Sequence, residues 1–155
     1  MTANPTPGNA PRPLPLDVER SRQAGSRFPK NLSVFERAWR TAEQLQTTGT
    51  AYYVQGFVAG SRSQPQEHAW VEQADRRIDP NLPHLPGDPA QFGYFVGRRF
   101  TVPQVRAAIA SAQEDYPEDD ALPIYDPAPY AYYGDRFLGG VAYQQAWAAA
   151  IAHRP

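Results

Sequence analysis

The chain of 155 residues contains no cysteine. This absence excludes disulfide bonds, zinc sites with thiolate ligands and a cysteine nucleophile supplied by this chain. The sequence also lacks an apolar run of about 18 residues, the length that spans a membrane, and its N-terminus has no basic stretch followed by an apolar one. We therefore expect neither a membrane-spanning helix nor a secretory leader, and the expected location is the cytoplasm.

Neither sign of charge is in excess. Fifteen basic residues against sixteen acidic ones leave a formal net charge of -1, and Lys30 is the single lysine. A protein that binds nucleic acid or a membrane surface needs a basic face, so we expect neither partner. Hydrophobic residues make up 41% of the chain and charged residues 20%, which is typical of one globular domain.

Prolines are frequent at the N-terminus, where residues 1–29 contain Pro5, Pro7, Pro11, Pro13, Pro15 and Pro29. Closely spaced prolines disfavour helices and remove backbone donors. We therefore predict a flexible, extended arm over residues 1–29, with at most a short helical turn near Leu16 to Gln23. A single domain is predicted over residues 30–155, and the arm is a possible attachment point for a protein partner.

The segment from Val34 to Gln46 has a helical pattern. Ser33 and Glu36 have the spacing of a capping box. The apolar residues recur at helical spacing and form one stripe: Phe35, Ala38, Trp39, Ala42 and Leu45. These features predict a helix over 34–46.

The rest of the sequence indicates an α+β domain. Strands are predicted over 51–59, 67–73, 76–79 and 92–100, a second helix after a cap at Thr101 and Gln104, and a final helix over 141–152. The connections are too short for repeated parallel crossovers. The predicted architecture is therefore an early helix packed on a small antiparallel sheet, with peripheral helices.

Two neighbouring predicted strands carry the candidate catalytic residues. His68 lies in the run His68-Ala69-Trp70-Val71-Glu72, and Asp79 precedes Pro80. Their separation of 11 positions allows two short strands and a turn to bring them side by side. An aspartate that binds one ring nitrogen fixes the tautomer of a histidine and leaves the other nitrogen free as a base.

Together with Gly56 at the end of Tyr53-Val54-Gln55-Gly56, these motifs resemble the core of the transglutaminase-like (papain-like) cysteine-enzyme superfamily. The resemblance implies that His68 is the base and Asp79 its orienting partner. It also implies a cysteine nucleophile at the start of the preceding helix, and in this register Val34 occupies that position. Valine has no nucleophilic atom, so the resemblance implies a non-catalytic member that binds a peptide or small ligand in a vestigial cleft.

Two other functions are also possible. One is a hydrolase or acyltransferase in which His68 and Asp79 act with Ser33 or water as the nucleophile. The other is a structural or accessory protein attached through its proline-rich arm. His68 could also be a buried structural histidine in any of these proteins.

Aromatic residues near the histidine and near the C-terminus are candidate ligand contacts. Trp70 shares a strand face with His68, and Tyr132 and Tyr133 lie in a tyrosine-rich segment that could line a groove or pack onto the sheet. His68, Asp79 and His84 could form a two-histidine, one-carboxylate metal set. Close histidine spacing is lacking, however, so no metal or cofactor is predicted. The acidic residues between 114 and 120 lack a calcium-loop pattern and are predicted to form a solvated loop.

Overall fold

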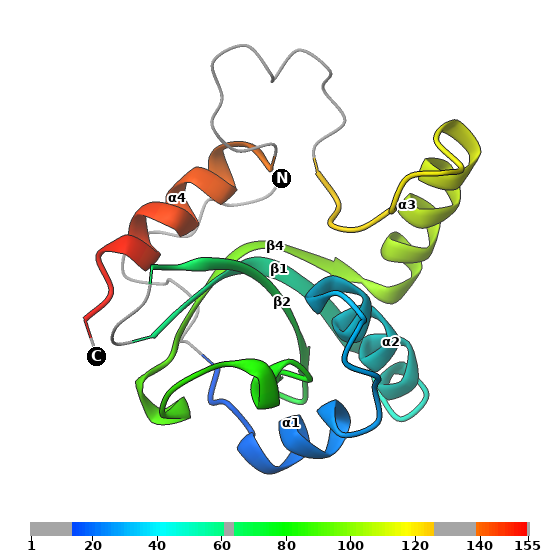
Figure 1. Ribbon diagram of the computed structural model, residues 1–155. Coiled ribbons are helices and arrows are strands. Elements are labelled where there is room, and N and C mark those ends of the chain that lie inside the picture. The colour runs from blue at the N-terminus through cyan, green and yellow to red at the C-terminus, as the bar shows by residue number, and fades with distance from the viewer. Residues whose placement is uncertain (1–13, 61–63, 126–138, 155) are drawn as a thin grey trace.

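The computed structural model describes residues 14–60, 64–125 and 139–154. Its centre is a four-stranded antiparallel sheet with the strand order β3-β2-β1-β4 (Figure 1). The strands are β1 (Ala51–Ala59), β2 (Gln66–Gln73), β3 (Arg76–Ile78) and β4 (Gly93–Thr101). The helices are α1 (Val18–Gly25), α2 (Val34–Gln46), α3 (Val102–Asp115) and α4 (Gly140–Ile151), and short 3-10 turns lie at Leu82–His84 and Pro89–Gln91. The predicted α+β class is confirmed.

The register of β1 and β2 divides the sheet into two faces. Tyr53 pairs with Val71, and Val54 pairs with Trp70. Because successive side chains of a strand point to opposite faces, odd-numbered residues of β1 and β2 share one face, here called the helical face. Even-numbered residues share the other, here called the polar face. Helices α2, α3 and α4 pack against the helical face, and the loop after β3 lies on the other side (Figure 1).

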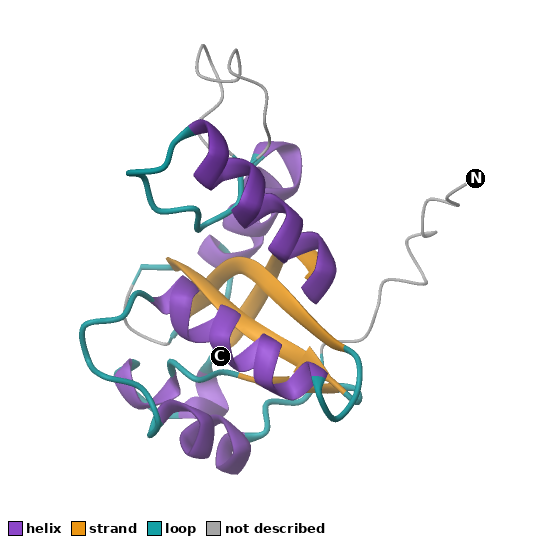
Figure 2. Cartoon of the chain, turned by 90° about the vertical axis from the view of Figure 1, so that its right-hand side faces the viewer, coloured by secondary structure: helices purple, strands orange, loops and turns teal. Residues whose placement is uncertain are grey.

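Two apolar clusters cover the helical face. The larger joins the stripe of α2 to β1, β2 and β3, and its members include Ala38, Trp39, Ala42, Tyr53, Val71 and Ile78. The ring of Trp39 meets that of Tyr53 edge-on, with centroids 6.5 Å apart. The smaller cluster joins α4 to the far end of β1 through Phe57, Tyr143 and Ala146. Figure 2 shows α2 crossing in front of the sheet and α3 above it.

The predicted helix over 34–46 is confirmed, although its cap is only half of a capping box. Ser33 accepts a hydrogen bond from the amide of Glu36 at 3.1 Å. The Glu36 carboxylate does not reach back but binds Arg40 at 2.8 Å. The capping box of α3 is complete, since Thr101 and Gln104 each bind the backbone of the other.

Gly56 lies at an irregularity in the sheet. The pairing of β1 with β4 shifts between Gln55 and Gly56, so that β4 contains an extra residue at this point. A Cβ atom at position 56 would lie 1.9 Å from the Phe95 carbonyl oxygen. A residue without a side chain is therefore required where the two backbones approach so closely.

The structure corrects the predicted arm. Leu16 forms a bridge with Arg77, and Asp17 caps α1 by accepting from the amide of Arg20 at 3.1 Å. Residues 14–29 therefore belong to the folded domain and do not form a flexible arm, whereas residues 1–13 lie outside the described residues. The physical reason is that no proline lies between Pro15 and Pro29, which leaves room for a capped helix of two turns.

Strand and helix boundaries elsewhere agree with the prediction to within one residue. The tight turn between β2 and β3 is centred on Ala74 and Asp75, with φ of 51° and 58°. Within the described ranges, no helix is long and apolar enough to cross a bilayer.

Candidate functional site

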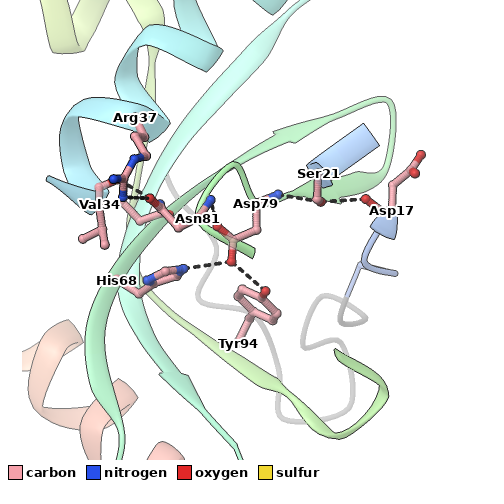
Figure 3. Close-up of polar contacts among 9 residues, drawn as sticks. Asp17, Ser21, Val34, Arg37, His68, Asp79, Asn81 and Tyr94 are labelled. Carbon is pink, nitrogen blue, oxygen red and sulfur yellow. Dashed lines mark hydrogen bonds and ion pairs between the residues drawn. The ribbon is translucent and has the colours of Figure 1, made fainter. Parts of the chain in front are cut away.

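His68 and Asp79 form a hydrogen-bonded pair. His68 lies on the polar face of β2, and Asp79 directly follows β3. The Nε2 atom of His68 is 2.8 Å from Oδ2 of Asp79 (Figure 3). The spacing of the two residues predicts this proximity because β2 and β3 form the expected hairpin.

The Asp79 carboxylate is wholly buried and is a hydrogen-bond acceptor at both oxygens. Oδ2 also accepts from the Tyr94 hydroxyl at 2.7 Å, and Oδ1 accepts from the Asn81 amide at 2.8 Å. The backbone amide of Asp79 donates to Ser21 of α1 at 2.8 Å, and Ser21 donates to the Asp17 carbonyl at 2.6 Å. These bonds hold the carboxylate in one orientation toward the imidazole.

Tyr94 completes the environment of the pair from β4. Burial, reinforced by the charge of Asp79 and the bond to it, raises the pKa of Tyr94 well above its ordinary value. The phenol therefore stays protonated and remains a donor to Asp79. Gly56 pairs with His68 on the intervening strand, and the rings of His68 and Tyr94 lie 6.3 Å apart.

Asn81 connects the start of α2 to the strand that carries His68. Its Nδ2 donates to the carbonyl of Val34 at 3.0 Å and to that of Ala69 at 3.2 Å. Its Oδ1 accepts from the buried guanidinium of Arg37 at 3.3 Å. Val34 is the first residue of α2. In the view of Figure 3 it lies on the side of the His68 ring opposite Asp79.

The described residues offer the second ring nitrogen of His68 no hydrogen-bonded nucleophile. Within the described part of the chain, Nδ1 makes no hydrogen bond. Val34 offers only a half-buried aliphatic side chain. The hydroxyl of Ser33 is an exposed helix cap that binds the Glu36 amide. The arrangement orients a histidine, and none of the residues that the structure describes is a nucleophile bonded to it.

The pair is also closed to solvent, because His68 is only 1% exposed. Four pockets found along the described residues have volumes between about 50 and 480 Å³, and none of these four has His68, Asp79 or Val34 in its wall. Among the described residues, His68 and Asp79 therefore lie in the interior of the domain.

Trp70, a predicted ligand contact, is a buried residue of the polar face. Its side chain is 0% exposed, and its Nε1 atom donates to Glu72 at 3.2 Å. The Arg77 guanidinium lies over its ring at 5.4 Å, and the His68 ring stacks on it at 6.3 Å. Trp70 packs the interior of the domain, because its neighbours on the polar face close over it.

Charged residues are buried next to Trp70 on the polar face. Glu72 binds the guanidinium of Arg99 and lies 3.6 Å from that of Arg77. Burial lowers the pKa of Arg77, and the neighbouring Glu72 carboxylate opposes this change. This network was not predicted from the sequence, because alternate polar residues near a strand end ordinarily indicate a solvent-exposed face.

The other predicted contacts do not extend the site. His84 is exposed on the 3-10 turn, and among the residues that the structure describes no group of three or more histidine or acidic residues could hold a metal ion. Tyr132 and Tyr133 lie outside the described residues. Tyr125 lies at the other end of β2 and donates to the Glu67 carboxylate at 3.1 Å.

Three residues of the site were missed by the sequence analysis: Ser21, Asn81 and Tyr94. The sequence offers a weak signal only for Asn81, which follows the Asp79-Pro80 step closely. Ser21 and Tyr94 reach Asp79 from α1 and β4, and no local pattern reveals such contacts.

No protein-family model matches this chain, and neither a curated protein nor a solved structure matches it. The geometry of the site therefore carries the functional argument.

Proposed function

We propose that this chain is a non-catalytic domain with a transglutaminase-like framework that acts by binding a partner. One observation carries the proposal. Val34 occupies the first position of α2, and its carbonyl accepts from Asn81, whose own amide donates to Asp79 of the buried His68–Asp79 pair. In our proposal this is the position at which a cysteine enzyme of this type would present its thiolate.

The chemistry of that position explains why catalysis is not expected. The N-terminus of a helix stabilises a thiolate through its partial positive charge, which is why a nucleophilic cysteine is favoured there. Valine has no atom to ionise. A general base must also come within hydrogen-bond distance of the proton that it removes, and His68 is enclosed by protein.

The buried pair has a structural role in this proposal. Asp79 joins β2 through His68, β4 through Tyr94 and α1 through Ser21. Because both oxygens of the buried Asp79 carboxylate accept hydrogen bonds, they favour one arrangement of the elements that these bonds join. His68 and Asp79 therefore hold the domain together, and the partner binds away from them.

Activity measurements test the absence of catalysis. We expect the wild-type protein and His68→Asn to hydrolyse p-nitrophenyl acetate, and to release ammonia from a glutamine-containing peptide, at the same background rates. A rate at least about 100-fold lower in a folded His68→Asn variant would establish His68 as a general base. Ser33→Ala would then distinguish the two alternative nucleophiles, because losing the hydroxyl abolishes only a serine mechanism.

A cysteine variant tests the framework itself. Because the chain has no cysteine, Val34→Cys introduces a single thiol whose alkylation by iodoacetamide can be followed against pH without background. We expect its pKa to fall below the ordinary value of about 8.5 and to return toward it in the double variant with His68→Asn. Gln113→Cys provides an exposed reference thiol. If the two single variants titrate alike, the transglutaminase-like interpretation is wrong.

A further inference from the structure

A groove lies beside α3, on the opposite side of the sheet from the polar face. The segment that follows α3 turns back alongside the helix, as Figures 1 and 2 both show. Together they enclose a pocket of about 480 Å³. Its wall includes Ala108, Ala112, Asp115, Asp119, Asp120 and Ile124. Pockets that hold ligands commonly have volumes of roughly 300 to 1,000 Å³.

Both sides of the groove are held in place by the core. On one side, α3 begins at its capping box and buries Val102 and Val105. On the other, the buried Gln55 side chain binds both backbone groups of Ile124, accepting from its amide at 2.6 Å and donating to its carbonyl at 2.8 Å. Leu122 also inserts into the core. The groove is thus preformed, which lowers the entropic cost of binding.

The interior of the groove is largely apolar. Small alanine side chains of α3 face Pro123 and Ile124 across it. Tyr116, at the turn between the two sides, is 66% exposed. A partner side chain that enters here can bury apolar surface against both walls, and the tyrosine ring can close over it.

The rim of the groove is strongly acidic. Residues 107–125 contain Glu114, Asp115, Glu118, Asp119 and Asp120 but no lysine or arginine. Of these, Asp115, Asp119 and Asp120 line the groove. None of these three is ion-paired with another residue in the described ranges. An apolar groove with unpaired carboxylates at its rim complements a cationic segment that also carries an apolar side chain.

We propose that this groove binds a short basic segment of a partner protein, with arginine or lysine beside a bulky apolar residue. The proposal rests on the proposed function only in that the chain acts by binding. Because Val34 does not line the groove, the thiol titration of Val34→Cys does not depend on it. Either proposal can therefore fail without the other.

The first test is fluorescence anisotropy with a fluorescein-labelled nonapeptide in which arginine and leucine alternate. One control peptide replaces arginine with glutamate and another replaces leucine with serine. We expect the wild-type protein to bind the first peptide at least about tenfold more tightly than either control. Failure to bind it, or equal binding of the serine peptide, would overturn the proposal.

Matched charge variants then locate the site. Asp115→Asn with Asp119→Asn removes two carboxylates from the wall, and Glu114→Gln with Glu118→Gln removes two from adjacent positions outside it. We expect the aspartate pair to weaken binding by about tenfold or more and the glutamate pair by less than about threefold. Equal weakening by the two pairs would reduce the effect to general charge attraction and contradict a specific groove.

A steric variant gives an independent measurement. Ser111→Trp places a large ring in the groove from an exposed position on α3, and Gln113→Trp places the same ring elsewhere on that helix. We expect about tenfold weaker peptide binding for the first and unchanged binding for the second. Unchanged binding in both would overturn the proposal. So would a wild-type dimer, seen by sedimentation, that Ser111→Trp dissociates, because the occupant would then be a second copy of the chain.

Discussion

The two faces of the sheet are buried by different means. On the helical face, Trp39 of α2 packs with Tyr53 and Val71, and the contacts are almost entirely apolar. On the polar face, His68, Glu72 and Asp79 are buried just as deeply, but they are held by hydrogen bonds and ion pairs. One small sheet therefore supports an ordinary core on one side and a buried polar network on the other.

The helical face stabilises the fold, whereas the polar face favours one particular arrangement of the elements. Apolar burial stabilises a fold in proportion to area and tolerates changes of shape. A buried polar network costs desolvation and returns that cost only if every partner is in place. The helical face is thus sufficient to drive folding, whereas the polar face dictates which neighbours Asp79 must have. The buried network supports our proposal that His68 and Asp79 have a structural role in a non-catalytic domain.

The largest expected effect is on the helical face. Trp39→Ala should lower the free energy of unfolding by about 3 to 5 kcal/mol, because it removes a large buried ring and leaves a cavity against Tyr53. Urea denaturation followed by circular dichroism measures this loss. Ile151→Ala, at a half-exposed position of α4, is the control and should cost less than about 1 kcal/mol. Similar losses in both variants would contradict the assignment of the main core to α2.

A smaller effect is expected on the polar face. Tyr94→Phe removes one donor to the buried Asp79 carboxylate and should cost about 1.5 to 3 kcal/mol, the range for hydrogen bonds to charged groups. Equilibrium denaturation measures the change. Tyr52→Phe deletes the hydroxyl of a more exposed ring and should change stability by less than about 0.5 kcal/mol. If both variants are equally stable, the hydrogen bond from Tyr94 to Asp79 does not contribute to the stability of the fold.

The smallest effect concerns the pH dependence of stability. Burial raises the pKa of Glu67 above its ordinary value, although hydrogen bonds from Tyr125 and Tyr143 oppose this. The unfolded chain therefore releases this proton at a lower pH than the folded chain does. The contribution of Glu67 to the free energy of unfolding is fully present below the pKa that this group has in the unfolded chain. It is lost as the pH rises through the raised pKa of the folded chain.

The variant Glu67→Gln cannot ionise and should lack this loss. Denaturation of both proteins at several pH values between about 4 and 7 compares the slopes. The wild-type protein should lose stability relative to the variant as the pH rises, by a small amount because Glu67 is only half-buried. Parallel curves would show that ionisation of Glu67 does not affect folding.

The structure also changes how attachment through the proline-rich N-terminal segment is best tested. A deletion of residues 1–29 would remove Ser21, which binds the backbone of Asp79. The proline-rich segment is therefore best tested for attachment by deleting residues 1–13 alone, which leaves α1 in place.

Much of the fold could be predicted because its signals are local. The apolar stripe of α2 has a helical period, and the strands are bounded by turns and prolines, so the element boundaries agree closely with the structure. The proximity of His68 and Asp79 also followed from local information. In a hairpin of two short strands, residues that are 11 positions apart, such as His68 and Asp79, have few ways to avoid lying side by side.

What the tertiary structure decided is which groups surround that pair. Tyr94 reaches Asp79 from β4, and Ser21 reaches it from a segment whose prolines suggested an arm. The burial of Trp70, the burial of His68 and the groove beside α3 likewise depend on segments that meet only after folding. The sequence by itself determined the elements, the His68–Asp79 hairpin and the valine at the start of α2, because period, spacing and residue identity are local properties. Exposure and hydrogen-bond partners were decided by packing, because they are properties of the space between elements.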